Sequence, residues 1–112
     1  MDVTYKNKKL QKYAEDERYS VQKLGPMRSE LYLKRVGDLI GAETLEDVRY
    51  LPGNYHDLKH NRKGQWACDL DQPYRLIFEP HENPIPTNPD GQYIWLEIKG
   101  VEILEIENYH GK

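Results

Sequence analysis

Residues 55–80 read YHDLKHNRKGQWACDLDQPYRLIFEP, and this stretch decides the fold. Turn-forming residues at 60–64 and 71–73 separate three short runs rich in aromatic and apolar side chains. The pattern predicts β-strands at about 55–58, 65–69 and 74–80, joined as hairpins. Basic side chains are concentrated on this hairpin array, within 20 residues: His56, Lys59, Arg62, Lys63 and Arg75.

The first half of the chain has helical rather than alternating periodicity. Residues 2–5 suit a short edge strand, and residues 6–16 suit a helix capped by Asn7. Pro26 is placed to begin a second helix that stops at Gly41, and Thr44 opens a third short one. Apolar residues at helical spacing predict the buried stripe of the second helix: Met27, Leu31, Leu33, Val36 and Ile40.

The last third returns to strand patterns. Residues 81–92 contain three prolines and an Asp-Gly turn signal, which predicts a loop. Strands are expected at 93–99 and 101–109, with a bend or bulge at Gly100. Helices followed by hairpin-linked strands predict an α+β fold: one domain, residues 1–112, with helices on one face of a twisted antiparallel sheet.

Composition limits the possible functions. The chain has 112 residues, 31% of them charged, and a net charge of −3, which disfavours tight binding to free nucleic acid. Cys68 is the only cysteine, so an intramolecular disulfide and a cysteine-based zinc site are excluded, and a buried position is expected. The sequence has no apolar run that suits a signal peptide or membrane span, so a cytoplasmic location is expected.

The basic residues suit metal-free cleavage of RNA. A ribonuclease of this kind needs a base for the 2′-OH, an acid for the leaving 5′-oxygen and positive charge beside the phosphate, and histidine suits both proton transfers. Each residue also has an ordinary structural interpretation. His56 suits a sheet edge, Arg75 suits a salt bridge to Glu79 or Glu105, and Tyr109-His110 suits a frayed chain end. His60 and His81 are not expected to be catalytic, and the histidine spacings predict neither a metal nor another cofactor.

Three segments carry a resemblance to a known family. LKHNRKGQW, PYRLIFEP and the closing ENYH resemble, in order and spacing, the HigB branch of the RelE/ParE toxin superfamily, in the plasmid-maintenance type of type II toxin–antitoxin systems. The resemblance covers the second half of the chain well and implies a RelE-like fold. It implies a ribosome-dependent mRNA endoribonuclease that acts in the A site and forms a hetero-oligomer with a HigA-like helix-turn-helix antitoxin.

The resemblance also assigns roles to individual residues. It implies that the catalytic set is His56, Lys59, Arg75, Tyr109 and His110, with Arg62 and Lys63 contacting RNA. The turn at 69–73 departs from the family pattern because it is acidic, and Asp71 is expected to weaken phosphate binding there. Two alternatives therefore stay open: a weak or inactive member that only binds an antitoxin, and a ParE-like inhibitor of DNA gyrase.

Overall fold

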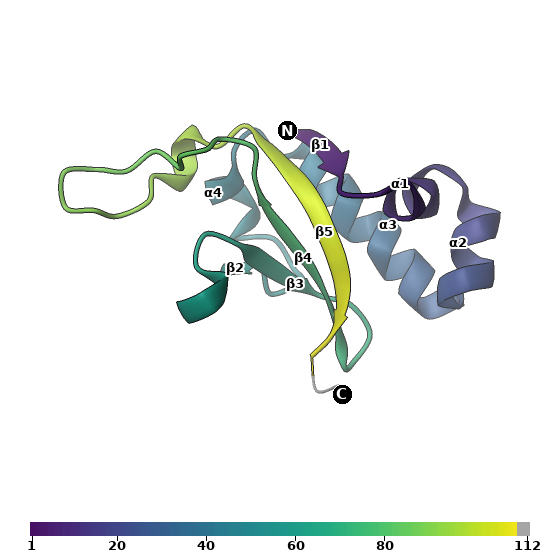
Figure 1. The fold of residues 1–112 in the computed structure, drawn as a ribbon. Helices are drawn as coiled ribbons and strands as arrows, with labels where there is room; N and C mark the ends of the chain where they lie inside the picture. Colours follow the sequence, from purple (N-terminus) through teal and green to yellow (C-terminus); the bar gives the residue numbers. More distant parts are fainter. Residues whose placement is uncertain (110–112) are drawn as a thin grey trace.

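The computed structural model describes residues 1–109 and has an α+β architecture (Figure 1). Helices fill the first half of the chain and strands the second. The helices are α1 (Lys8–Glu15), α2 (Glu17–Leu24), α3 (Pro26–Gly41) and α4 (Leu45–Val48), with short 3₁₀ turns η1 (His60–Arg62) and η2 (Trp95–Glu97). The strands are β1 (Asp2–Tyr5), β2 (His56–Asp57), β3 (Trp66–Asp69), β4 (Tyr74–Pro80) and β5 (Gly100–Asn108).

The five strands form one sheet in the order β1-β5-β4-β3-β2. β2, β3, β4 and β5 pair antiparallel, as predicted, but β1 pairs parallel to β5, so the sheet is mixed. Hairpin turns force neighbouring strands to run antiparallel, whereas all four helices separate β1 from its partner. The connection between β1 and β5 therefore did not determine whether they would pair parallel or antiparallel. The prediction of a wholly antiparallel sheet was wrong at this edge.

Side chains at the helix ends define the helices. Asn7 caps α1 by accepting a hydrogen bond from the Leu10 amide at 2.9 Å, as predicted. Asp16 ends α1 and caps α2 by accepting from the Tyr19 amide at 3.1 Å. α2 was not predicted from the sequence, because its polar residues show no clear apolar stripe. α3 begins at Pro26 and ends at Gly41, as predicted.

The buried face of α3 differs from the predicted stripe. Val36 is buried, but Met27 and Ile40 are 66% and 55% exposed. The helix instead buries a face that contains polar as well as apolar residues: Ser29, Tyr32, Arg35, Val36 and Leu39. Its polar atoms are satisfied inside the protein: the Ser29 hydroxyl donates to Ser20 at 2.7 Å, and the Tyr32 hydroxyl donates to the Leu10 carbonyl at 2.7 Å. Apolar periodicity therefore identified Val36 and Leu31, which packs against the core, but not the polar and aromatic members of the buried face.

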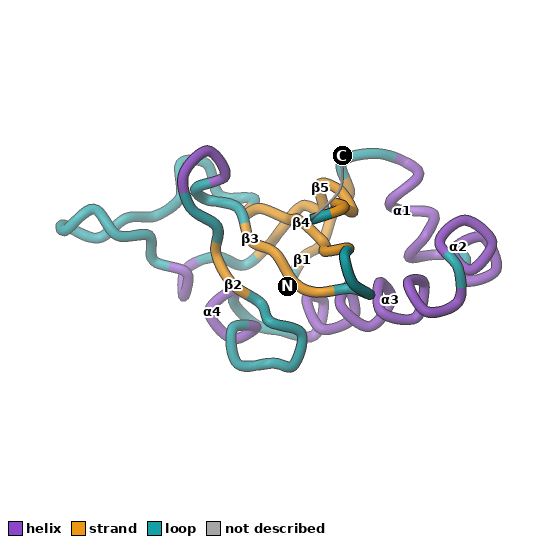
Figure 2. Tube along the Cα trace, turned by 90° about the horizontal axis from the view of Figure 1, so that it is seen from below, coloured by secondary structure: helices purple, strands orange, loops and turns teal. Residues whose placement is uncertain are grey.

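The core lies between α3 and one face of the sheet, and Figure 2 shows the helices gathered on that side. Tyr32 and Leu39 of α3 belong to the same buried cluster as Trp66 and Phe78 of the central strands. Burial of large side chains such as these stabilises the fold by about 1.5–3 kcal/mol each. The opposite face of the sheet, called the open face below, has a smaller apolar cluster around Ala67 and Ile77, to which none of the helices α1–α4 in residues 1–109 contributes a side chain.

The segment before β5 is not the strand expected at 93–99. Tyr93 forms one isolated bridge with Thr87, and Trp95–Glu97 is a 3₁₀ turn. β5 begins only at Gly100, and its bulge lies further along than predicted. The register with β4 shifts between Ile77 and Phe78, and this shift leaves Leu104 without an opposite residue. The bulge sends Leu104 to the smaller apolar cluster of the open face.

Residues 81–97 form an extension that projects from the sheet in both Figure 1 and Figure 2. Its tip is a tight turn in which the Asn88 carboxamide accepts hydrogen bonds from the amides of Asp90 and Gln92, at 2.9 and 3.0 Å. The predicted loop is thus an ordered hairpin-like segment. In residues 1–109, no helix has the length and apolar character that a membrane span requires.

Cys68 is fully buried on β3, as predicted, and burial raises the pKa of its thiol well above the ordinary range. We therefore expect no reaction of the folded protein with a thiol-specific disulfide reagent at pH 8, because the thiolate is the reactive form. Denaturant should release one reactive thiol per chain. Cys68→Ala carrying Tyr50→Cys, at an exposed position, serves as the reactive control. Rapid labelling of the folded wild type would contradict the burial of Cys68 and the raised pKa of its thiol.

Candidate active site

The candidate site lies on the open face, where three neighbouring strands bring charged side chains into one row. Asp69 of β3 is in register with Arg75 of β4, which is in register with Glu107 of β5. Residues in register on adjacent strands project from the same face of a sheet. The next row places Ala67 beside Ile77 and Ile77 beside Glu105. The open face therefore alternates a charged row with a more apolar one.

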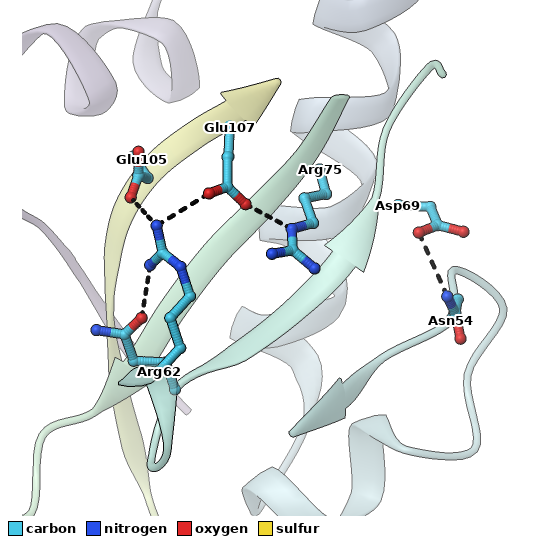
Figure 3. A network of polar contacts seen from close by, with 7 residues as sticks. Asn54, Arg62, Asp69, Arg75, Glu105 and Glu107 are labelled. Atoms are coloured by element: carbon cyan, nitrogen blue, oxygen red, sulfur yellow. Dashed lines mark hydrogen bonds and ion pairs between the residues drawn. The ribbon is translucent and has the colours of Figure 1, made fainter. Parts of the chain in front are cut away.

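Two arginines share Glu107 on this face, as Figure 3 shows. Arg75 Nε donates to one carboxylate oxygen at 2.6 Å, and Arg62 Nη2 donates to the other at 3.0 Å. Arg62 also contacts Glu105 at 2.9 Å and Gln65 at 2.7 Å. The hydrogen bond with Glu105 raises the pKa of Arg62, against the opposing effect of burial. Arg75 thus has a carboxylate partner, and that partner is Glu107, not Glu79 or Glu105.

A pocket of about 200 Å³ lies beside this network and joins three separate segments. Three of the residues predicted to be catalytic line it: His56 from β2, Arg75 from β4 and Tyr109 just beyond β5. The Arg75 guanidinium lies 4.2 Å from the centre of the Tyr109 ring, within cation–π distance. The Tyr109 amide donates to the Pro73 carbonyl at 2.7 Å, which ties the end of β5 to the turn before β4.

Hydrogen bonding defines the tautomer of His56. Its Nδ1 lies 2.7 Å from the Asn54 carbonyl oxygen, which can only accept, so Nδ1 carries the proton. In the neutral ring, Nε2 is then the unprotonated nitrogen and is free to accept a proton. This arrangement is what a general acid or base requires.

Arg35 of α3 packs beneath the loop that carries Asn54 and His56, against Gly53, and its role was not predicted from the sequence. Arg35 is buried, with 8% exposed, and its Nε donates to the Asp69 carbonyl at 2.7 Å. Gly53 lies directly against it: φ is 126°, and a β-carbon there would lie 2.9 Å from Cζ of Arg35. One feature of the sequence could have indicated that Arg35 is buried: it directly precedes Val36, an apolar position of the predicted helix.

Within the acidic turn at 69–73, the charge of Asp71 is neutralised by an ion pair with Arg28. Asp71 accepts two hydrogen bonds from Arg28 of α3, at 2.9 and 3.0 Å, and the Arg28 guanidinium stacks 3.5 Å from the centre of the Tyr74 ring. The hydrogen bond with Asp71 raises the pKa of Arg28. Arg75 forms its ion pair with Glu107 and is in register with Asp69, so any weakening of phosphate binding at Arg75 would come from Glu107 rather than from Asp71.

The remaining basic residues of the hairpin array lie elsewhere. The Lys59 side chain is 73% exposed, bonds to Asp57 at 3.0 Å, and lines a second pocket together with Lys63 and His60. Burial favours a raised pKa for Asp57, but the hydrogen bond and charge of Lys59, with Arg49, outweigh it and lower the pKa of Asp57. Lys59 and His56 therefore do not share the smaller pocket.

The two remaining histidines of the chain are His81 and His110. His110 lies outside the described residues. His81 bonds to the Thr4 hydroxyl at 2.7 Å and packs against Gly100, where a β-carbon would clash with its ring. This is a structural position that joins β1 to the start of β5. Within residues 1–109, no cluster of three or more histidine, cysteine or acidic side chains is arranged to hold a metal ion.

No family model and no curated protein matches this sequence. A solved structure, the YoeB/ParE toxin from Agrobacterium tumefaciens, is similar to this chain with a TM-score of 0.47 and 12% sequence identity. The similarity extends over 96% of this chain and 98% of that one.

Arg28→Ala should remove both the ion pair with Asp71 and the stacking on Tyr74. We expect the free energy of unfolding to fall by about 1–2 kcal/mol, from one partly buried charge-assisted pair and one cation–π contact. Urea denaturation followed by circular dichroism measures this change. Arg18→Ala, at an exposed position on α2, is the matched control and should have little effect. Equal stability of the two variants would show that the Arg28 contacts contribute nothing measurable.

Proposed function

We propose that this protein is the toxin of a type II toxin–antitoxin pair and that it cleaves mRNA without a metal ion. One observation carries the proposal: His56, Arg75 and Tyr109, which the family resemblance assigns to catalysis, come from three distant segments and line the same pocket. The motif resemblance and the α+β fold support the toxin assignment, and the residue types in the pocket support ribonuclease chemistry.

In the proposed reaction the 2′-oxygen of a ribose attacks the adjacent phosphorus and displaces the 5′-oxygen of the next nucleotide. One histidine, His56 or His110, removes the 2′-hydroxyl proton, and the other donates a proton to the leaving oxygen. Arg75 offers paired N–H donors to the phosphate as negative charge builds on it. Tyr109 orients the Arg75 guanidinium or stacks on a base. The products are a 2′,3′-cyclic phosphate and a 5′-hydroxyl.

The charge of the open face supports a requirement for the ribosome. Two arginines, Arg62 and Arg75, stand beside the three carboxylates of Asp69, Glu105 and Glu107. A surface with this balance attracts free RNA weakly, because affinity for RNA depends on cations that neutralise phosphates. A ribosome that presents mRNA in its A site removes the need for tight binding in solution. A HigA-like helix-turn-helix antitoxin would hold the toxin inactive in a hetero-oligomer.

The same charge balance favours a second candidate function, that of a catalytically inactive member that only binds an antitoxin. If Glu107 keeps its contacts with Arg62 and Arg75 in the presence of RNA, neither arginine is available to a phosphate. This candidate predicts antitoxin binding without growth arrest, and the proposed ribonuclease predicts both.

Inducible expression in a bacterium, with mapping of mRNA 5′ ends, tests the proposed activity. Wild type should arrest growth and produce new cuts inside translated messages. Arg75→Ala, His56→Ala and His110→Ala should each lower cleavage by at least about 100-fold, the scale of a lost acid or base. Arg18→Ala should cleave like wild type. All variants should retain the wild-type circular dichroism spectrum.

The outcomes separate the candidates. Full toxicity of both Arg75→Ala and His110→Ala would refute the catalytic assignment. Normal growth with intact messages, together with antitoxin binding, would support the inactive member. Intact messages with inhibited DNA supercoiling would instead support a ParE-like action on gyrase.

Glu107→Gln should strengthen RNA binding, because it keeps the shape of the side chain and removes the charge that Arg62 and Arg75 now neutralise. A gain of about fivefold is expected, since a unit charge at about 4 Å contributes on the order of 1 kcal/mol in water. Fluorescence anisotropy with a 2′-O-methyl RNA oligomer measures it without cleavage. Glu102→Gln, on the same strand outside the network, controls for net charge. Equal gains in both variants would disprove a specific role for Glu107.

A further inference from the structure

A larger pocket, of about 740 Å³, lies between the turn at η1 and the extension formed by residues 81–97. Its volume falls within the range of about 300–1,000 Å³ that is typical of small-molecule sites. Its lining includes two kinds of side chain that can bind a ligand, basic and aromatic. Lys59 and Lys63 bring positive charge from the turn, and Tyr93 and Trp95 bring aromatic rings from the extension.

The aromatic wall is anchored to the core. The Tyr93 ring centre lies 5.2 Å from that of Trp95, and Trp95 packs edge-to-face on the fully buried Trp66 at 5.4 Å. The extension also contacts the turn directly: a β-carbon on Gly64, where φ is 97°, would lie 3.2 Å from the Ile85 side chain. The two walls are therefore held against each other, and the pocket is preorganised.

The charges of the pocket favour an anion. Within residues 1–109, Lys63 forms no ion pair, and its ammonium lies 5.5 Å from the Tyr93 ring centre. Asp57 is the one carboxylate on the lining, and it is already engaged by Lys59 and Arg49. Lys63 is therefore available to a ligand, beside rings that can accept a flat partner.

We propose that this pocket binds one nucleotide of single-stranded RNA outside the scissile position, with its base against Tyr93 and Trp95 and its phosphate at Lys63. This inference rests on the proposed function and extends it to substrate selection. Aromatic rings beside lysines form the usual combination by which proteins hold single-stranded RNA. Lys59 lines this pocket and not the smaller one, and in this proposal it makes a second contact with the phosphate.

Binding is measured with a 2′-O-methyl RNA hexamer and with nucleoside 5′-monophosphates, by anisotropy and by quenching of Trp95 fluorescence. The hexamer cannot react, so the result is independent of cleavage. Tyr93→Leu should weaken hexamer binding by about fivefold to 100-fold, the scale of one lost stacking contact. Lys63→Gln should weaken it and reduce its dependence on salt. Trp95→Phe should abolish most of the quenching, because Trp66 is buried.

Two exposed residues that do not line the pocket provide matched controls: Tyr50→Leu for the aromatic change and Lys8→Gln for the charge change. Lys63→Gln alters only an exposed side chain. Its effect on hexamer binding therefore still tests the proposal if Tyr93→Leu loosens the extension. In the expression experiment, Tyr93→Leu should still cut messages but change the nucleotide preferred beside the cut.

The two proposals fail in different ways. Hexamer binding that depends on Lys63 and Tyr93, in a protein that cuts no message, would support the pocket and refute the ribonuclease. Message cutting by wild type with unchanged binding and site choice in both variants would refute the pocket alone. Loss of antitoxin binding in the variants, with hexamer binding intact, would also refute it and make the pocket a protein-binding surface.

Discussion

The buried guanidinium of Arg35 is the constraint on which the candidate site depends. A charge inside a protein is tolerated only when its hydrogen bonds are satisfied, and Arg35 satisfies one by donating to the Asp69 carbonyl at the end of β3. The same side chain supports Gly53, so one residue of α3 sets both the strand end and the loop that leads to His56. Displacement of α3 would therefore disturb the pocket even if every residue that lines it remained in the chain.

The sequence was sufficient for the features that depend on local patterns. The turns around Gly64 and Pro73 set the hairpins, and Asn7, Pro26 and Gly41 set helix ends, because each acts through its own backbone or immediate neighbours. The errors concern choices made at long range. The direction of β1 and the buried face of α3 depend on partners distant in sequence, and apolar spacing did not reveal that Ser29 and Tyr32 would be buried with their hydroxyls satisfied.

The candidate site shows the same division. The motif placed His56, Arg75 and Tyr109 together, and the structure brings them to one pocket, but the partner of Arg75 depends on the register between β4 and β5. The bulge at Leu104 shifts the register by one residue and brings Glu107, rather than Ile106, opposite Arg75. A single unpaired residue in β5 thus decides whether a carboxylate lies opposite the arginine, and no local pattern in the sequence specifies it.

The order of strands in the sheet also has a consequence for synthesis. β5 lies between the first strand of the chain and β4, and Tyr109, just beyond it, completes the pocket. During synthesis, β1 has no strand to pair with, and β4 can pair only with β3, until residues 100–109 have left the exit tunnel. Contacts between segments so distant in sequence form slowly. Closure of the sheet and completion of the pocket therefore depend on β5, the last strand that the structure describes.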